Sequence, residues 1–243
     1  MHNTITSYLQ CYKRPDYLVE QIEAIKKQTI PTSKFVIVHN EGGMEIDYAS
    51  AYFSGKPLDV FYANPNQKFH FRFTIALLAS TEYVAFFDDD TIPGEKWFEN
   101  CIDTIKRHDC VCVTNGRIYT HDKRSPWLCP GWGNPSTKEI EVDFGGHAWF
   151  LKTENLRYMW QDKIHNINNG EDIMLSANLK RFGGIPTFVP PHPPTDKSLW
   201  GSGDKAVKYG SDEVASWIVN PIHFEERVEL IEKYIKSGWK TLK

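Results

Sequence analysis

Three consecutive aspartates directly follow a short apolar run in this sequence. Residues 83–87 (YVAFF) have the aromatic and β-branched character of a buried strand, and Asp88, Asp89 and Asp90 come immediately after it. Like charges this close repel one another strongly unless a cation is held between them. Oxygen ligands suit Mg²⁺ or Mn²⁺, so the triplet predicts a divalent metal site. The alternative is a solvated acidic turn that caps the helix after Pro93.

The position of the triplet in the expected fold favours the metal site. Short β-rich runs alternate with amphipathic helical patterns, as in βαβ units on a largely parallel sheet. In such sheets ligands bind beyond the carboxyl ends of the strands, where the aspartates should lie. The expected strands are residues 4–10, 34–39, 58–62, 83–87, 111–114, 141–143, 148–151 and 186–189, and the expected helices begin at 14–16 or cover 71–80, 95–107, 171–182 and 225–236.

Composition narrows the class of protein and its partners. A chain of 243 residues suits one sizeable α/β domain. The formal net charge of −3 gives no general attraction to a polyphosphate backbone, which argues against nucleic acid as the main partner. No apolar run approaches membrane-spanning length and no leader pattern opens the sequence, so we expect a cytoplasmic protein without a transmembrane segment. The five cysteines show no CxxC spacing and are expected to be reduced.

Two segments are expected to be irregular. Residues 125–135 are rich in Gly, Pro and Trp, which predicts a surface loop. Residues 190–210 are rich in Pro, Gly and charge, which predicts a mobile loop that closes over a ligand. In that lid, residues 201–203 (GSG) would supply hinge freedom and Trp200 an apolar cover.

Several motifs occur in an order that resembles the GT-A fold glycosyltransferases, with FFDDDTIP (86–93) as the DXD motif. TSYLQCYKRPDYL (6–18) and IVHNEGG (37–43) resemble the base-binding strand ends of family 2, and NPNQKFHFRF (64–73) resembles a stretch of exostosin-like transferases. VDFGGHAWFLKTENL (142–156) resembles the Gly-Gly segment between donor sugar and acceptor, and NNGEDIMLSANLKRFGG (168–184) resembles the ED motif at a helix start. A DXD motif alone is weak, but the series in this order is specific.

The resemblance implies a single-domain GT-A fold, a Rossmann-like mixed β-sheet flanked by helices. Residues from about 1 to 115 would form the nucleotide-sugar-binding half, and residues from about 116 to 243 the acceptor-binding half with the C-terminal helix. The implied activity is metal-dependent transfer of a hexosyl or N-acetylhexosaminyl group from a UDP-sugar to a glycan or other hydroxyl acceptor, as in polysaccharide biosynthesis. Mn²⁺ or Mg²⁺ is the implied cofactor. The sugar, the acceptor and the anomeric outcome stay open.

The resemblance also implies roles for individual residues. Asp88 and Asp90 would bind the metal, and His192, just beyond the last expected strand, stands where several GT-A families place a third ligand, with His223 as a weaker competitor. A lone histidine among prolines is more often simply exposed. The implied nucleotide-sugar contacts are Gln10, Tyr12, Arg14, Asn40, Asn64, Arg72, Asp88, Asp89, Gly145 and Gly146, and the implied acceptor surface is Trp127, Trp132, His147 and Trp149.

Inverting transfer needs a carboxylate base near the acceptor hydroxyl. Asp172, with Glu171 beside it at a helix start, fits that need, although both carboxylates could serve only to stabilise the helix dipole. A nucleotidyltransferase of similar fold is an alternative, but the N-terminal segment lacks a Gly-rich phosphate loop. A non-catalytic carbohydrate-binding relative is a second alternative.

Overall fold

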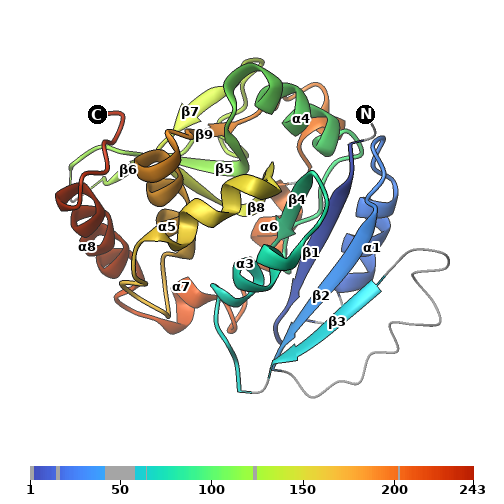
Figure 1. Ribbon diagram of the computed structural model, residues 1–243, viewed down its shortest axis with the longest axis horizontal. Helices are drawn as coiled ribbons and strands as arrows, with labels where there is room; N and C mark the ends of the chain where they lie inside the picture. The colour runs from blue at the N-terminus through green and yellow to red at the C-terminus, as the bar shows by residue number, and fades with distance from the viewer. Residues whose placement is uncertain (1–2, 15–16, 42–57, 64, 123–124, 202) are drawn as a thin grey trace.

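The computed structural model describes residues 3–14, 17–41, 58–63, 65–122, 125–201 and 203–243. Within these residues a mixed sheet of nine strands runs in the order β3-β2-β1-β4-β8-β5-β9-β7, with β6 paired to β5 (Figure 1). The strands are β1 (Ile5–Cys11), β2 (Lys34–Asn40), β3 (Leu58–Ala63), β4 (Tyr83–Phe87), β5 (Val111–Tyr119), β6 (Trp127–Leu128), β7 (Ile140–Val142), β8 (Phe144–Lys152) and β9 (Thr187–Val189).

Helices pack on both sides of this sheet (Figure 1). The α-helices are α1 (Leu18–Lys26), α3 (Phe71–Ile75), α4 (Trp97–His108), α5 (Glu171–Asn178), α6 (Gly203–Tyr209), α7 (Ser216–Val219) and α8 (His223–Lys236). The 3₁₀ and π segments are η2 (Ala76–Leu78), η3 (Thr153–Gln161), η4 (Leu179–Gly183) and η5 (Lys197–Leu199).

The sheet changes direction at its centre. Strands β3, β2, β1 and β4 are all parallel, as the βαβ pattern predicts, whereas β8 pairs antiparallel with both β4 and β5. The carboxyl ends of β1 and β4 therefore meet the beginning of β8. This arrangement brings the aspartates after β4 next to the Gly-Gly segment of β8.

The alternation of side chains along the strands produces two cores. Phe86 of β4 belongs to the core beneath α5 and α8, whereas its neighbour Phe87 belongs to the core beneath α1 and α4. Both phenylalanines are fully buried, as the continuous apolar run YVAFF predicts for a central strand covered on both faces. The sheet is thus a rigid support for the aspartate turn at the end of β4.

The structure corrects some of the expected element boundaries. Strand β8 is longer than residues 148–151 because it includes Gly145 and Gly146, and a Cβ at Gly145 would lie 2.5 Å from a Val113 methyl of β5. The expected helix 71–80 is two short pieces, α3 and η2. The expected loop 125–135 contains β6, and η3 lies where no element was expected. Residues 15 and 16 of the expected first helix lie outside the described residues.

The expectation that residues 190–210 form a loop without packed elements is wrong for most of its length. Residues 197–199 form η5, and the side chain of Asn100 on α4 donates to the carbonyls of Pro191 (2.7 Å) and Leu199 (3.0 Å). Trp200 is only 8% exposed, and its indole N–H donates to the Pro193 carbonyl, so it packs inward instead of covering a ligand. Helix α6 occupies residues 203–209 of the same segment.

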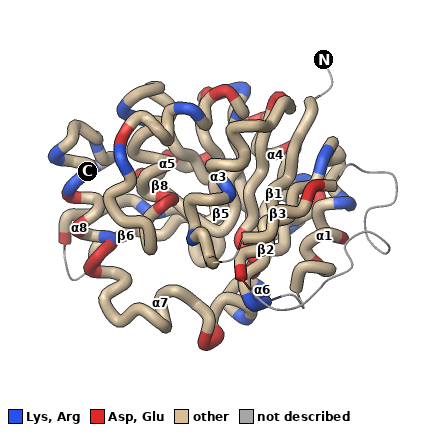
Figure 2. Tube along the Cα trace, turned by 60° about the horizontal axis from the view of Figure 1, so that its bottom comes forward, with Lys and Arg blue, Asp and Glu red and all other residues tan. Residues whose placement is uncertain are grey.

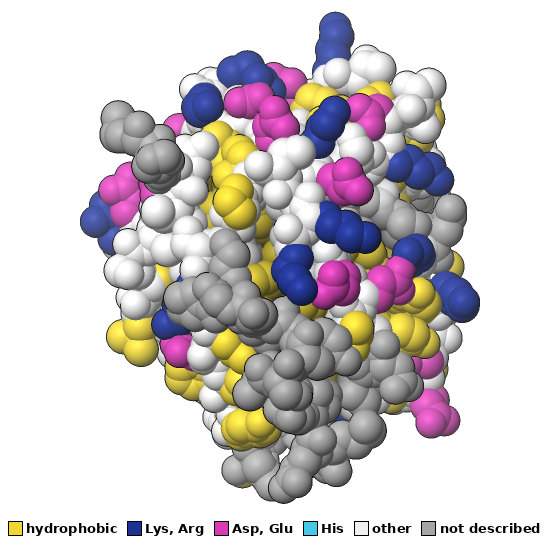
Figure 3. Space-filling model, turned by 90° about the vertical axis from the view of Figure 1, so that its right-hand side faces the viewer, with side chains coloured by type: hydrophobic (Ala, Val, Ile, Leu, Met, Phe, Trp, Pro, Cys, Tyr) yellow, Lys and Arg dark blue, Asp and Glu magenta, His cyan; other side chains and the backbone are white. Residues whose placement is uncertain are grey.

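The surface of the described part of the chain is mixed in character. On the face over α1 and β3, basic and acidic side chains are interspersed (Figure 3). None of the helices in the described residues combines the length and apolar character needed to cross a bilayer.

Candidate active site

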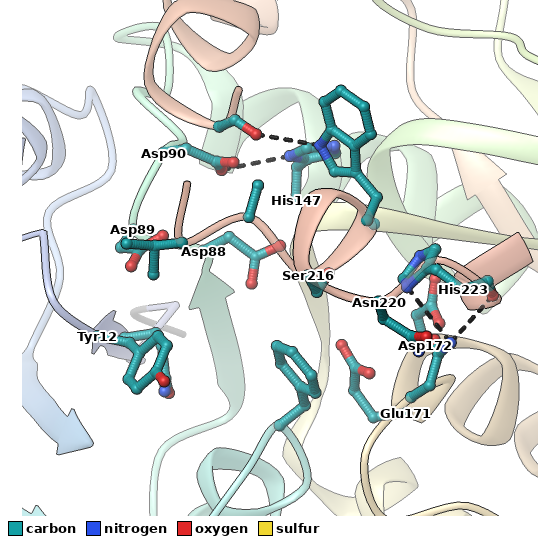
Figure 4. Close-up of a pocket in the computed structure, with 18 of the residues that line it drawn as sticks. Tyr12, Asp88, Asp89, Asp90, His147, Glu171, Asp172, Ser216, Asn220 and His223 are labelled. Atoms are coloured by element: carbon teal, nitrogen blue, oxygen red, sulfur yellow. Dashed lines mark hydrogen bonds and ion pairs between the residues drawn. The ribbon is translucent and has the colours of Figure 1, made fainter. Parts of the chain in front are cut away.

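A cavity of about 1060 Å³ opens where the carboxyl ends of β1 and β4 meet β8. Its walls come from distant parts of the chain: the ends of β1 and β4, the middle of β5 and β8, the start of α5, and the segment from α6 to α8. Figure 4 shows Asp88, Asp89 and Asp90 on one side of this space and Glu171 and Asp172 on the other. The two acidic motifs of the sequence therefore face one cavity.

Backbone contacts hold the aspartate turn against β8. The N–H of Asp88 donates to the carbonyl of His147 at 2.9 Å, which joins the end of β4 to β8. His147 has a positive φ of 71°, an uncommon conformation for a residue other than glycine, and it follows Gly146 directly. This backbone conformation accompanies the placement of the imidazole beside the carboxylates.

Asp88, Asp90 and His147 form a group that could hold a metal ion. Each offers one ligand atom, and the three atoms lie within 4.8 Å of one another. His147 Nδ1 lies 3.3 Å from Asp90 Oδ1. Burial is the largest single influence and opposes the ionisation of both groups. The charges and hydrogen bonds of their neighbours, mainly those between Asp90 and His147, together outweigh it, so the pKa of Asp90 is lowered and that of His147 is raised.

His192 does not join this group. Its two ring nitrogens lie 2.9 Å from the backbone carbonyls of Pro190 and Asn134, and the side chain is buried away from the cavity lining. The structure thus places His147, which the sequence assigned to the acceptor surface, where His192 was expected. His223 does line the cavity, but beside Asn169 at the start of α8 and outside the three-residue group.

The middle aspartate has a different environment from its neighbours. Asp89 Oδ1 accepts from Arg14 Nη1 at 2.8 Å. Burial raises the pKa of Asp89 to about 7, although the charge of Arg14 acts in the opposite direction. Arg14 also donates through Nε to Asp212, at 2.8 Å, so this guanidinium joins the strand end to the segment after α6.

A buried arginine connects the two acidic motifs. Arg72 on α3 is 1% exposed, pairs with Asp88, and places Nη2 3.3 Å from Glu171 Oε1. Its guanidinium carbon lies 4.6 Å from the centre of the Trp149 ring. Arg72 was expected to contact the nucleotide sugar; instead it lies behind the cavity wall, where it compensates the charge of both carboxylates.

Glu171 and Asp172 begin α5, where backbone N–H groups favour negative charge. Asp172 Oδ1 accepts from the Ile173 N–H at 2.9 Å, and Oδ2 accepts from Arg227 of α8 at 2.6 Å. Burial, reinforced by the charge of Asp172, raises the pKa of Glu171 to about 7. Burial therefore disfavours the charged form of Glu171, while its neighbour Asp172 is held in an ion pair with Arg227.

Most of the expected nucleotide-sugar residues do line the cavity: Gln10, Tyr12, Arg14, Asn40, Asp88, Asp89 and Gly146. Gly145 instead packs against β5, and Asn64 lies outside the described residues. Gly146 stands beside the base candidate, since a Cβ there would be 3.9 Å from Asp172 Oδ2.

All four expected acceptor residues border the cavity, but in different ways. Trp127 and Trp132 are half-buried, and the Trp132 ring lies 4.4 Å from the His147 ring. Trp149 is 1% exposed and donates its indole N–H to the Gly145 carbonyl at 2.8 Å. Its ring is therefore mainly a core side chain.

Sequence reasoning missed several residues of this site. Arg227, Asn169, Asp212 and Arg117 all carry charge or hydrogen bonds at or near the cavity. Arg227 lies in an amphipathic helix of mixed charge, ordinary for a surface helix, and nothing in the local sequence marks it as the partner of Asp172. Only the packing of α8 on α5 brings them together.

The model of the family described as glycosyl transferase family 2 matches residues 8–162, more than half of the chain. The chain belongs to glycosyl transferase family 2. The matched region includes the aspartate triplet and the Gly-Gly segment. Family membership supports glycosyl transfer, as the sequence motifs predict, in preference to nucleotidyl transfer.

Solved structures agree with this assignment at the level of the fold. A crystal structure of S. aureus TarS superposes with a TM-score of 0.61 and 16% identity, over 96% of this chain and 39% of that one. The structure of S. aureus TarS 1-349 gives a TM-score of 0.61 and 15% identity, over 96% of this chain and 65% of that one. The family 2 chain therefore spans less than two thirds of either. No curated protein matches it.

The expected single-domain GT-A fold is confirmed by the family match and these structures. The expected exostosin-like features of residues 64–73 are not confirmed by them.

Proposed function

We propose that this family 2 protein transfers a sugar from a nucleoside-diphosphate sugar to a hydroxyl of a carbohydrate acceptor. The proposed donor is a UDP-sugar. One observation supports this most directly. The same cavity has the candidate metal ligands Asp88, Asp90 and His147 on one side and the Glu171–Asp172 pair on the other. Residues up to about 115 would hold the donor, and residues from 116 onward the acceptor.

The possible metal-ligand atoms of this cluster fit a divalent cation. Two carboxylate oxygens and one imidazole nitrogen lie within 4.8 Å of one another, and Mn²⁺ accepts such mixed oxygen and nitrogen ligands. Asp88, Asp90 and His147 would hold the ion, leaving positions for diphosphate oxygens. The bound metal would neutralise charge on the departing diphosphate.

The chain's own residues would position the rest of the donor. Gln10, Tyr12 and Asn40 line the cavity at the ends of β1 and β2, where the base and ribose would lie. Arg14 would contact diphosphate, for which it must exchange at least one of its two carboxylate partners. Gly146 leaves room for the donor sugar beside Asp172.

Asp172 is our proposed general base. It would face the acceptor half and is held by Arg227 of α8. Glu171 instead accepts from Arg72, and in Figure 4 it lies between Asp172 and the aspartate turn. The contact with Arg227 fixes the orientation of the Asp172 side chain, and a carboxylate in this place could accept a proton from the acceptor hydroxyl.

Calorimetric titration with UDP, with and without Mn²⁺, tests the proposal. Without the cation, the carboxylates repel the diphosphate, so binding should be weaker by about tenfold or more. Asp90→Ala should abolish the Mn²⁺-dependent part, whereas Asp103→Ala, an exposed position on α4, should leave it intact. The metal assignment is contradicted if Mn²⁺ does not change the UDP affinity of the unmodified protein. It is also contradicted if Mn²⁺ still increases the UDP affinity of Asp90→Ala.

Hydrolysis of UDP-sugars separates an enzyme from a non-catalytic relative. An active enzyme should release UDP slowly from the correct donor even without acceptor. A thermal-shift screen of nucleotide sugars with Mn²⁺ identifies that donor, because a ligand bound only by the folded state raises the melting temperature. Binding without any turnover would favour a carbohydrate-binding relative.

A further inference from the structure

Arg117 lies on β5, opposite Phe144 of β8, and is one of the residues of the C-terminal half of the chain that line the cavity. Its Nη1 donates to the side-chain oxygen of Asn115 and to the carbonyl of Gly116, both at 2.8 Å. Both partners are neutral. Among the described residues, none supplies a carboxylate within ion-pairing distance of this guanidinium, so its charge has no direct ion-pair partner.

The other arginines at the site differ in this respect. Arg14 pairs with Asp89 and Asp212, Arg72 with Asp88 and Glu171, and Arg227 with Asp172. A half-buried cation without a counter-charge is costly, and burial accordingly lowers the pKa of Arg117. An anion bound to this guanidinium would relieve that cost.

The position of Arg117 connects it to the acceptor, not to the diphosphate. Arg117 pairs with Phe144 of β8, and the guanidinium of Arg227, the partner of the proposed base, lies 5.3 Å from the centre of the Phe144 ring. Trp127 pairs with Tyr119 of β5, the strand of Arg117, and Gly131, next to Trp132, is bridged to Asn115. Both tryptophans line the cavity, and the Trp127 ring meets the Phe144 ring edge-on at 5.8 Å. Aromatic rings of this kind pack against sugar rings, and the guanidinium fork matches a carboxylate or a phosphate.

We propose that Arg117 binds an anionic group of the acceptor glycan, a sugar carboxylate or a phosphate ester, while Trp127 and Trp132 contact the sugar that carries it. The inference rests on the proposed function, because it assumes that an acceptor enters this half of the cavity. It extends that function by naming the charge class of the acceptor.

A glycan array that contains neutral, uronate-bearing and phosphate-bearing glycans tests the inference. The protein, loaded with UDP and Mn²⁺, should retain acidic glycans in preference to neutral ones. Arg117→Gln should weaken that retention by about 10- to 100-fold, the loss expected for a hydrogen bond to a charged group. Selective retention of uronates identifies a carboxylate, and selective retention of phosphorylated glycans identifies a phosphate ester.

Two further variants make the result interpretable. Arg117→Lys keeps the charge without the fork and should recover part of the retention. Arg157→Gln removes a fully exposed arginine of η3 and should change nothing. Preference for neutral glycans, absence of any retained glycan, or equal retention by Arg117→Gln and the unmodified protein overturns the inference.

UDP calorimetry on the same samples separates the two proposals. Normal Mn²⁺-dependent UDP binding without a preference for acidic glycans defeats the inference alone, and absence of UDP binding defeats the proposed function.

Discussion

Asp172 combines two roles that a single substitution can separate. Its carboxylate accepts from the Ile173 N–H at the start of α5 and from Arg227 on α8, so it contributes to structure whatever its chemistry. A general base must in addition take up a proton during the reaction. An amide of the same size retains much of the hydrogen bonding but cannot accept that proton.

Asp172→Asn should therefore lower turnover by about 10²- to 10⁴-fold with little change in donor affinity. Asp162→Asn is the matched control, since Asp162 also pairs with an arginine, Arg181, at 2.7 Å. The control should lose some stability and no activity. Near-normal turnover in Asp172→Asn would leave the residue with its structural role only, because Asn caps a helix as well as Asp does.

His70 gives a pH dependence that is independent of the chemistry. It is 3% exposed at the start of α3, and burial, followed by the charge of Arg72, lowers its pKa to about 4 from 6.5. The folded state therefore prefers the neutral ring. Between pH 6.5 and 4 the unfolded chain takes up a proton that the folded chain does not, so stability falls as the pH is lowered.

Replacing His70 should flatten this dependence. The shift corresponds to about 3 kcal/mol of stability lost by pH 4, and His70→Gln should remove that loss when unfolding by urea is compared at pH 7 and pH 4.5. The exposed His121, replaced in the same way, serves as control. Equal pH slopes for the unmodified protein and His70→Gln would show that His70 does not cause the effect.

Residue types and spacing in the sequence predict some residues of the site, but not the side chains that pair with them. Asp88, Asp90 and the Glu171–Asp172 pair stand at the ends of recognisable elements, so their common cavity follows from the fold. The place of His147 depends on a positive φ and on pairing between β4 and β8, and neither is visible in the sequence.

At the scale of elements, the segment from α6 to α7 replaces the expected lid loop. It crosses beneath the strand ends from the side of α1 to the side of α8 (Figure 2). Tyr209 stacks on Tyr17 with ring centres 3.8 Å apart, and its hydroxyl donates to Glu20 of α1 at 2.9 Å. Lys205 also pairs with Glu20. A Cβ at Gly210 would meet Asp90, so this segment directly covers the aspartate turn.

These few contacts predict local opening with little global effect. Tyr209→Ala removes the stacking and the hydrogen bond, together about 1–2 kcal/mol, which would raise the open population of α6 by about 5- to 30-fold. Limited proteolysis should then cut residues 203–215 faster at an almost unchanged melting temperature. The rate of local cleavage in Tyr209→Phe, which keeps the ring, should lie between the rates in the unmodified protein and in Tyr209→Ala. A uniform fall in melting temperature without faster local cleavage contradicts this picture.

Element boundaries were predictable where apolar patterning was continuous. YVAFF of β4 occupies residues 83–87 as predicted, whereas α1 begins at Leu18 instead of residues 14–16. Proline and glycine misled the prediction for residues 190–210, because the side chain of Asn100, far away in sequence, satisfies the backbone carbonyls there. Local composition cannot reveal such a distant partner.

At the scale of the whole molecule, the N-terminal and C-terminal halves share one sheet and one buried ion network. Strands β4 and β8 pair antiparallel at the centre, and Arg72 from α3 bridges Asp88 after β4 and Glu171 on α5. The network lies between the two halves, at the back of the cavity. The stability of each half should therefore depend on the other, and the chain should unfold in a single calorimetric transition.

Arg72→Met tests this dependence, because it leaves two partly or fully buried carboxylates without their cation. Such a loss typically costs about 3–5 kcal/mol, whereas Arg107→Met, which breaks an exposed pair with Glu139, should cost less than about 1 kcal/mol. The cost arises mainly from the carboxylates left behind. Glu171→Gln in the same chain removes one of those charges, so the double variant should be more stable than Arg72→Met alone at pH 8. If the two substitutions instead destabilise additively in a urea double-mutant cycle, Arg72 and Glu171 are not energetically coupled, and the network does not join the halves.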